Sequence, residues 1–139
     1  MSLPSQPQRK LQPNVDEIQP RQILVLPQGD RRLYGEVIDV DQQRQRVWLR
    51  PLILVEEQTG SDREHPNQAA TPTIHLLQDD SDLLWPLALF RPALDTELLP
   101  FWLELTQTPR PPQTPIAAQT FRQFIAQVWA THPALFRLP

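Results

Sequence analysis

Three apolar stretches in the first half of the chain give its clearest pattern. A continuous run covers 23–26, and β-rich stretches follow at 33–40 and 46–55, with polar, turn-like residues between them. Stretches at this spacing predict neighbouring strands of an antiparallel meander. A fourth strand is predicted at 73–77, where a short apolar stretch ends at a group of aspartates.

Two residues indicate where these strands depart from regular geometry. Pro51 has no N–H to donate, so the third strand is expected to lie at a sheet edge or to bend there. Gly35 interrupts the second stretch and predicts a bulge or a close approach of another backbone. Side chains alternate along a strand, so Val47 and Leu49 should face one side of the third strand and Trp48 the other.

The segment 83–105 is apolar and interrupted by prolines at 86, 92 and 100. Because proline breaks a helix interior, no long helix can form there. We expect a strand at 83–85, an extended crossing, and one or two helical turns around 96–103.

The last part of the chain predicts the best-defined helix. Thr114 is a suitable N-cap, and Pro115 suits the first helical position. The residue before Pro133 resists helical geometry, so the helix should end near Thr131. Its apolar stripe consists of Ala117, Phe121, Phe124, Ile125 and Val128.

These elements predict an α+β protein with a small antiparallel sheet, arranged as an SH3-like meander or partly open barrel, and a C-terminal amphipathic helix. Residues 1–20 are polar and rich in proline and glutamine. We expect them to form a disordered tail, because few apolar side chains offset the entropy of ordering. Residues 21–139 then form a single domain with a mobile loop at about 56–72.

The amino-acid composition limits the kinds of connection, chemical site and cellular location that we expect. The chain has 139 residues, with 17 prolines against 3 glycines, which favours stiff, extended connections. Cysteine is absent, which excludes disulfides, thiol catalysis and thiolate metal sites. No apolar core of a signal peptide and no stretch long enough to span a membrane is present, so we expect a cytoplasmic protein without membrane contact.

We find no catalytic centre, cofactor site or metal site in the sequence. The histidines, at 65, 75 and 132, are far apart, and the carboxylates at 79, 80 and 82 match only a fragment of a calcium loop. The glycines are isolated, and the four serines lie in polar contexts outside any nucleophile-elbow motif. We therefore do not expect an enzyme, and binding to another macromolecule is the remaining class of function.

An aromatic, proline-stiffened segment at 83–102 favours protein binding. A broken segment cannot place all of its apolar side chains on one helical face, so some should complete the core and others should be open to a partner. Tryptophan and arginine are enriched at binding hot spots. The candidate contact residues in this segment are Trp85, Leu89, Phe90, Arg91, Phe101 and Trp102.

A second candidate surface lies on the predicted meander. Arginine alternating with tryptophan on a strand can stack on bases and contact phosphates, although arginine stems can equally cover an exposed indole. The net charge of −3 disfavours nucleic acid, which requires a basic surface. The residues concerned are Tyr34, Arg44, Arg46, Trp48 and Arg50, of which Tyr34, Trp48 and Arg50 are also candidates for protein contact.

Two blocks in the middle of the chain carry a family resemblance. The first contains LYGEVI and VWLRPL within 33–52, and the second contains LWP and LFRPALDTE within 84–97. They resemble a group of small cyanobacterial proteins that includes the CcmS-like carboxysome assembly factors. The resemblance implies a chaperone-like protein that binds the C-terminal extension of a hexameric carboxysome shell protein and associates with carboxysomes.

We therefore expect a non-enzymatic assembly factor or chaperone that binds another protein. Under the resemblance, this partner is the C-terminal tail of a carboxysome shell protein. The alternative is an SH3-like module that binds RNA or a ribonucleoprotein. The sequence is also compatible with a homo-oligomer.

Overall fold

The computed structural model describes residues 18–57, 71–77 and 82–137. In these residues six strands form one sheet of order β4-β3-β2-β1-β6, with β5 also paired to β3, and all pairs are antiparallel. The α+β class and the meander of the first three strands are confirmed. The strands are β1 (Ile23–Gln28), β2 (Arg31–Asp41), β3 (Arg46–Glu56), β4 (Thr73–Leu76), β5 (Leu83–Pro86) and β6 (Arg91–Pro92).

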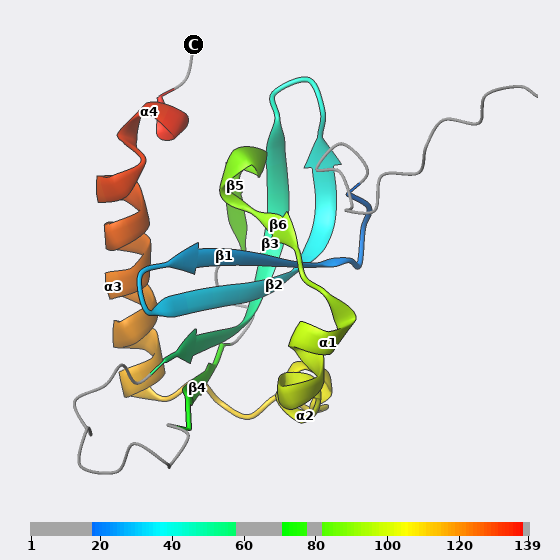
Figure 1. Ribbon diagram of the computed structural model, residues 1–139, viewed down its shortest axis with the longest axis vertical. Coiled ribbons are helices and arrows are strands. Elements are labelled where there is room, and N and C mark those ends of the chain that lie inside the picture. Colours follow the sequence, from blue (N-terminus) through cyan, green and yellow to red (C-terminus); the bar gives the residue numbers. More distant parts are fainter. Residues whose placement is uncertain (1–17, 58–70, 78–81, 138–139) are drawn as a thin grey trace, which may run out of the picture.

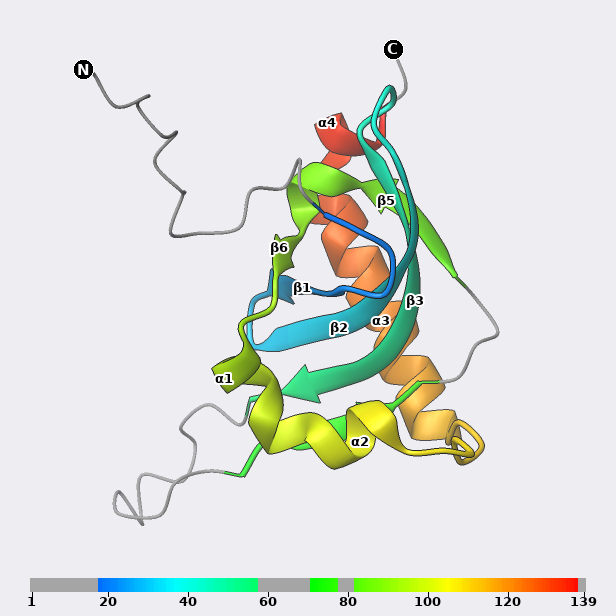
Figure 2. The same ribbon diagram turned by 90° about the vertical axis from the view of Figure 1, so that its right-hand side faces the viewer.

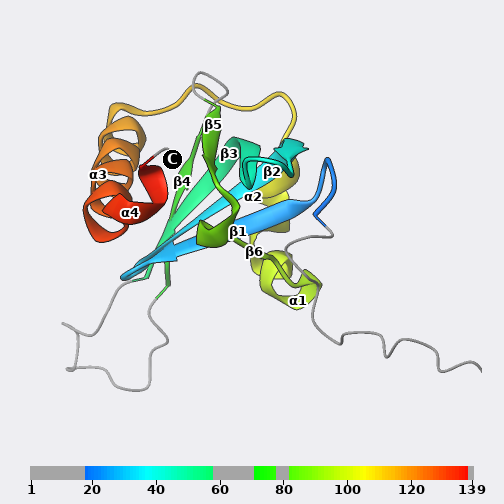
Figure 3. The same cartoon turned by 90° about the horizontal axis from the view of Figure 1, so that it is seen from above.

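Helices cover both faces of this sheet (Figure 1, Figure 3). The long C-terminal helix lies against one face, and the short helices that follow β6 lie against the other. The helical turns expected around 96–103 are thereby confirmed. The helices are η2 (Leu87–Leu89), α1 (Asp95–Leu98), η3 (Leu99–Phe101), α2 (Trp102–Thr106), α3 (Pro115–Thr131) and α4 (Pro133–Phe136).

β3 is an inner strand that curves along its length (Figure 2). On the side away from β2, residues 46–49 pair with β5 and residues 53–56 pair with β4. Pro51 lies between these two pairings, where its missing N–H interrupts neither ladder. Of the two alternatives, an edge position is therefore excluded, and a register shift against β2 lies next to Pro51.

Gly35 lies opposite Pro51 at a register shift between β2 and β3, which confirms the predicted bulge. A Cβ atom at Gly35 would lie 2.6 Å from Leu49 Cγ and 2.9 Å from the Arg50 carbonyl oxygen, and nearer still to Leu49 Cδ2. The predicted close approach of another backbone is also confirmed, because the Arg50 carbonyl oxygen lies within 3 Å of the position that a Cβ atom would take.

The sheet has a separate hydrophobic core on each face. Alternate residues of one strand belong to different cores, so β1 is apolar without interruption over 23–26 and β3 over 51–55. The first core, on the face covered by α3, includes Leu24, Leu26, Leu33, Leu49, Leu54, Trp85, Phe121, Phe124 and Val128. The second core, under α1, η3 and α2, consists of Val25, Tyr34, Leu52, Ile53, Val55, Leu98, Phe101 and Leu105.

α3 begins and ends where the sequence predicts. The Thr114 hydroxyl oxygen accepts a hydrogen bond from the backbone N–H of Ala117 at 3.0 Å, and Pro115 is the first helical residue. Of the predicted stripe, Ile125 is partly buried, and the other members are buried in the first core or beside it. The helix ends at Thr131, before the turn that precedes Pro133.

The guanidinium group of Arg110 attaches the linker before α3 to the sheet. Arg110 donates hydrogen bonds to the carbonyl oxygens of Leu77 at 3.1 Å, of Glu104 at 3.2 Å and of Leu52. The Leu52 carbonyl also accepts from the Leu77 N–H, so this arginine joins β3, α2 and the end of β4 near the bend.

We expect Arg110→Ala to lower the free energy of unfolding by about 1.5 kcal/mol, because three carbonyl groups lose a charged donor. Arg122→Ala is the control, since Arg122 is exposed on α3 and should change stability by less than about 0.5 kcal/mol. Urea denaturation of both variants measures the difference. Equal midpoints for the two variants would show that the linker does not depend on Arg110.

The described residues begin inside the segment expected to be a tail. Ile18 is only 5% exposed and packs in the first core, so the ordered chain extends at least to this residue. The rest of the predicted tail, residues 1–17, and most of the predicted loop, residues 58–70, lie outside the described residues. Within the described ranges, no helix is both long and apolar enough to cross a membrane.

Candidate functional site

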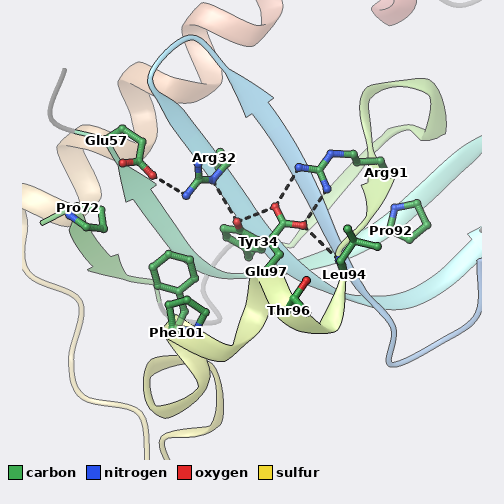
Figure 4. A pocket seen from close by; sticks show the side chains of 11 residues that line it. Arg32, Tyr34, Glu57, Pro72, Arg91, Pro92, Leu94, Thr96, Glu97 and Phe101 are labelled. Carbon is green, nitrogen blue, oxygen red and sulfur yellow. Dashed lines mark hydrogen bonds and ion pairs between the residues drawn. The ribbon is translucent and has the colours of Figure 1, made fainter. Parts of the chain in front are cut away.

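A pocket opens between the N-terminal end of β2, β6 and the short helices that follow it (Figure 4). We call it the α1 pocket, and its volume is about 730 Å³. Apolar side chains make up much of the lining, and two ion pairs supply its charges. The lining residues are Arg32, Tyr34, Glu57, Pro72, Arg91, Pro92, Leu94, Thr96, Glu97, Pro100 and Phe101.

Glu97 on α1 is the centre of the hydrogen-bond network in this pocket. Its two carboxylate oxygens accept a bidentate pair of bonds from Arg91, at 2.8 and 2.9 Å. The same oxygens accept from the Tyr34 hydroxyl at 3.0 Å and from the Leu94 backbone N–H at 3.2 Å. These hydrogen bonds, the Arg91 pair first, hold the pKa of Glu97 below its usual value.

Tyr34 connects Glu97 to a second ion pair. Its hydroxyl accepts a hydrogen bond from Arg32 Nε at 3.1 Å, and Arg32 also bonds Glu57 at 2.7 Å. Burial and the hydrogen bond to Glu97 raise the pKa of Tyr34 above its usual value. Hydrogen bonds thus connect five residues in series, as Figure 4 shows. In order they are Glu57, which follows β3, Arg32 and Tyr34 on β2, Glu97 on α1, and Arg91 on β6.

This network does not have the properties of a catalytic acid–base pair. A general base near neutral pH needs a carboxylate with a raised pKa, whereas that of Glu97 is lowered and its oxygens are fully engaged. The pKa of Tyr34 is raised, whereas a phenol that acts as a base near neutral pH needs a lowered pKa. The arrangement holds charges in fixed positions around an apolar floor, which suits recognition of a ligand.

No cluster of metal-ligating side chains occurs in the described part of the chain. His75 lies in β4, as expected, and its Nε2 is 2.9 Å from Glu56 Oε1. This is a pair of two residues, with Arg31 bonded to the other carboxylate oxygen of Glu56 at 3.0 Å. Hydrogen bonding by His75 and Arg31 lowers the pKa of Glu56.

Apolar side chains are exposed beside the α1 pocket. Leu94 is half exposed at the pocket wall, and Trp102 is 55% exposed at the start of α2. Leu99 and Leu103 lie three residues before and one residue after Trp102 and are more exposed still. Since their neighbours Leu98, Phe101 and Leu105 fill the second core, this helical segment is apolar on its outer side as well. We call the four exposed side chains, Leu94, Leu99, Trp102 and Leu103, the outer patch.

The structure separates the candidate protein-binding residues into four groups, of which three involve the core or the surroundings of the α1 pocket. Trp85, Leu89 and Phe90 are buried in the first core, so they are core residues and offer no surface to a partner. Tyr34 and Phe101 are also buried in the second core, yet they form part of the pocket lining. Arg91 at the pocket and Trp102 in the outer patch remain accessible, and both were predicted contact residues.

Trp48 and Arg50 lie on a different surface. Trp48 is 46% exposed and pairs across strands with the exposed Leu84. Its indole N–H donates to Asp82 at 2.8 Å, and Arg50 lies 3.8 Å from Asp82 and 4.0 Å from Glu36. The predicted alternation along β3 is confirmed, because Val47 and Leu49 on the opposite side are fully buried.

Sequence reasoning missed Arg32, Glu57 and Glu97, which complete the pocket. They are far apart in the chain: the Tyr34–Glu97 bond joins residues separated by 63 positions. One signal was present, because a buried tyrosine hydroxyl requires a hydrogen-bond partner. Reading Tyr34 as buried would have prompted a search for that partner.

Comparison of the chain with protein-family models, with curated proteins and with solved structures gives no match.

Proposed function

We propose that this protein is a non-enzymatic binding protein that holds an extended segment of another protein in the α1 pocket. The observation that carries the proposal is the combination of an apolar pocket with fixed charges and the adjacent outer patch. A rigid receptor loses little conformational entropy when it binds, which favours affinity. The ion pairs Arg91–Glu97 and Arg32–Glu57 keep the pocket walls in place and supply the polar contacts.

The outer patch supports a protein partner. Tryptophan is enriched at interaction hot spots, and exposed apolar side chains grouped next to a pocket are typical of an interaction site. Arg91, with a side chain that is 48% exposed, provides a charged rim. Both features extend the contact area beyond the pocket itself.

The specific form of the proposal comes from the family resemblance. In that form the bound segment is the C-terminal extension of a carboxysome shell protein, and the protein acts as an assembly factor at the carboxysome. The pocket and the outer patch are suited to a short extended tail, but they do not by themselves select this partner.

The test measures fluorescence anisotropy of a labelled peptide with the sequence of a shell-protein C-terminal extension, titrated with the full chain. We expect saturable binding that Trp102→Ala weakens about tenfold, since a partly buried hot-spot indole contributes of the order of 1–2 kcal/mol. The matched control is Trp129→Ala, because Trp129 is similarly exposed but belongs to α3 on the opposite face of the sheet.

Two outcomes would contradict the proposal at different levels. No binding of the extension by the full chain would remove the carboxysome version. Binding that Trp102→Ala leaves intact, or that Trp129→Ala weakens equally, would remove the α1 pocket and outer patch as the site.

The alternative function, RNA binding, has its support in the exposed Trp48 beside Arg46 and Arg50. Asp82 and Glu36 offset the charge of Arg50, and Asp82 also bonds the indole, so this surface attracts phosphate weakly. We expect no change in the anisotropy of labelled single-stranded RNA at low salt. Salt-sensitive binding that Trp48→Ala abolishes would favour the alternative.

A further inference from the structure

The strands at the edges of the sheet differ in the backbone groups that they present outward. In an antiparallel pair, residues alternate between those whose N–H and C=O bond the neighbouring strand and those whose groups point away from it. An edge strand therefore presents outward donors and acceptors at every second residue, and another strand can add there. The backbone hydrogen bonds of this sheet show which residues of its edge strands point outward.

Proline occupies outward positions on three strands. The Ala93 N–H bonds a carbonyl of β1 at 3.0 Å, so Pro92, one residue earlier, points away from β1. The Leu87 N–H bonds the carbonyl of the residue before β3 at 2.9 Å, so Pro86 on β5 points away from β3. The β1–β2 hydrogen bonds likewise place Pro27 on the side of β1 away from β2, beyond the residues that pair with β6. Because proline has no N–H, none of these positions can donate to an added strand.

β4 presents a different edge. The Leu77 N–H bonds the Leu52 carbonyl at 3.0 Å, in register with the β3–β4 pairing, so Ile74 and Leu76 point away from β3. β4 is the last strand at one end of the sheet, and its sequence contains no proline. Within residues 18–57, 71–77 and 82–137, no backbone group bonds the N–H of Ile74 or Leu76. Two donors at the spacing of a ladder therefore point outward from this strand.

The same strand begins at the α1 pocket. Pro72, the residue before β4, lines the pocket together with Glu57, which follows β3. Figure 4 shows these two residues at one end of the pocket, opposite Arg91 and Pro92. An extended segment that leaves the pocket at this end therefore meets the outer edge of β4.

We propose that the partner segment in the α1 pocket continues along the outer edge of β4 and adds a strand to the sheet. This inference rests on the proposed function, since both place a segment of another protein in that pocket. It adds the conformation of the segment and the backbone groups that hold it. In this mode of recognition, main-chain hydrogen bonds supply affinity and alternate side chains supply specificity.

The faces of β4 define the sequence class of the segment. The side chains of Ile74 and Leu76 are partly buried and pack against the second core. Residues of an added strand that lie opposite them share this face, where apolar and β-branched side chains would extend the core. Thr73 and His75 are on the other face, so the residues beside them are expected to be polar. The partner segment is therefore a proline-free strand that alternates apolar and polar residues.

Hydrogen exchange of the full chain tests the added strand directly. The probes are peptides selected on the full chain from a phage-displayed library of random linear sequences, because an added strand is held mainly through its backbone. We expect a bound peptide to slow the exchange of the Ile74 and Leu76 amide protons at least about tenfold. The Leu84 amide, which points outward on β5, is the internal control and should keep its rate. Unchanged exchange at both β4 amides in a saturated complex would overturn the inference.

N-methylation of the selected peptides tests the ladder from the side of the ligand. Every second amide of an added strand bonds β4, and the amides between them point away. Methylation at successive positions should therefore lower affinity about tenfold at alternate residues, with little effect at the residues between. Each neighbour is the matched control for the loss of flexibility that methylation causes. A loss of affinity without this alternation would show that the segment does not bind as a strand.

A proline substitution tests the same contact on the protein. Ile74→Pro removes an outward donor while every N–H that bonds β3 remains, and it should weaken the selected peptides about tenfold. Leu84→Pro makes the matched change at the outward position of β5 and should leave affinity unchanged. Equal affinities of the two variants would contradict the role of β4. Circular dichroism establishes that each variant is folded, and if Ile74→Pro is not, the exchange and methylation results decide.

These outcomes can be told apart from those that test the proposed function. Peptides that Trp102→Ala weakens but that leave the Ile74 and Leu76 amides unprotected would support the function and overturn the added strand. Protection of these amides by selected peptides, together with no binding of a shell-protein extension, would support the added strand and remove the carboxysome partner.

Discussion

Gly35→Ala should lower the free energy of unfolding by about 3 kcal/mol, the upper range for overpacking a well-filled core. The new Cβ would lie 2.9 Å from the Arg50 carbonyl oxygen, a backbone atom that cannot move without disturbing the pairing of β2 with β3. It would also contact Leu49, which is fully buried in the first core. Urea denaturation followed by circular dichroism measures the change.

Gly29→Ala provides the matched control. Gly29 has a positive φ of 59°, but nothing lies within 4 Å of a Cβ placed there. This substitution should cost only about 1 kcal/mol, the usual penalty of the left-handed conformation for alanine. If the two variants were equally stable, close approach of the backbone at Gly35 would not be the reason for glycine there.

Glu97→Ala should lower the free energy of unfolding by about 2.5 kcal/mol at neutral pH. The substitution leaves the buried Tyr34 hydroxyl without its acceptor, removes the partner of Arg91 and frees the Leu94 N–H at the start of α1. Asp95→Ala, which changes an exposed carboxylate on the same helix, should cost less than about 0.5 kcal/mol.

The pH dependence of this effect has a definite sign. The pKa of Glu97 is lowered in the folded protein from an ordinary value of 4.5, chiefly by Arg91. Its contribution to stability is therefore present above about pH 4.5 and is lost as the pH falls through the folded-state value. The difference between the parent protein and Glu97→Ala should shrink in acid, and a difference that stays constant to pH 3 would contradict this role for Glu97.

Local signals in the sequence were sufficient for much of the fold. Thr114 and Pro115 place the start of α3 because capping depends only on neighbouring residues. Gly35 predicts its bulge for the same reason, since a missing side chain has a local meaning. Local signals were not sufficient to place the strand that contains Pro51. Whether this strand lies at an edge of the sheet depends on β4 and β5, which follow it in the chain.

The candidate site was predicted only in part, and the reason is the second core. Sequence patterns do not reveal that α1, η3 and α2 cover the second face of the sheet, so the exposure of aromatic residues could not be assigned. Phe101 and Trp102 are adjacent in sequence, yet one is buried and the other open to solvent. Arg91 and Trp102 were identified by residue type alone, whereas Glu97 requires knowledge of the long-range bond to Tyr34.

Two-sided burial of the sheet also affects how the strands find their pairing. In a sheet with one solvated face, a slip by one residue exposes apolar side chains and is penalised. Here Leu24 and Val25 both face a core, so a slipped strand would exchange one apolar face for another. Correct pairing must therefore depend on local features, such as the glycine at the bulge and the buried Tyr34 hydroxyl, which donates to Glu97. Mispaired and aggregation-prone forms should accumulate during refolding of Gly35 and Glu97 variants more than their equilibrium stabilities imply.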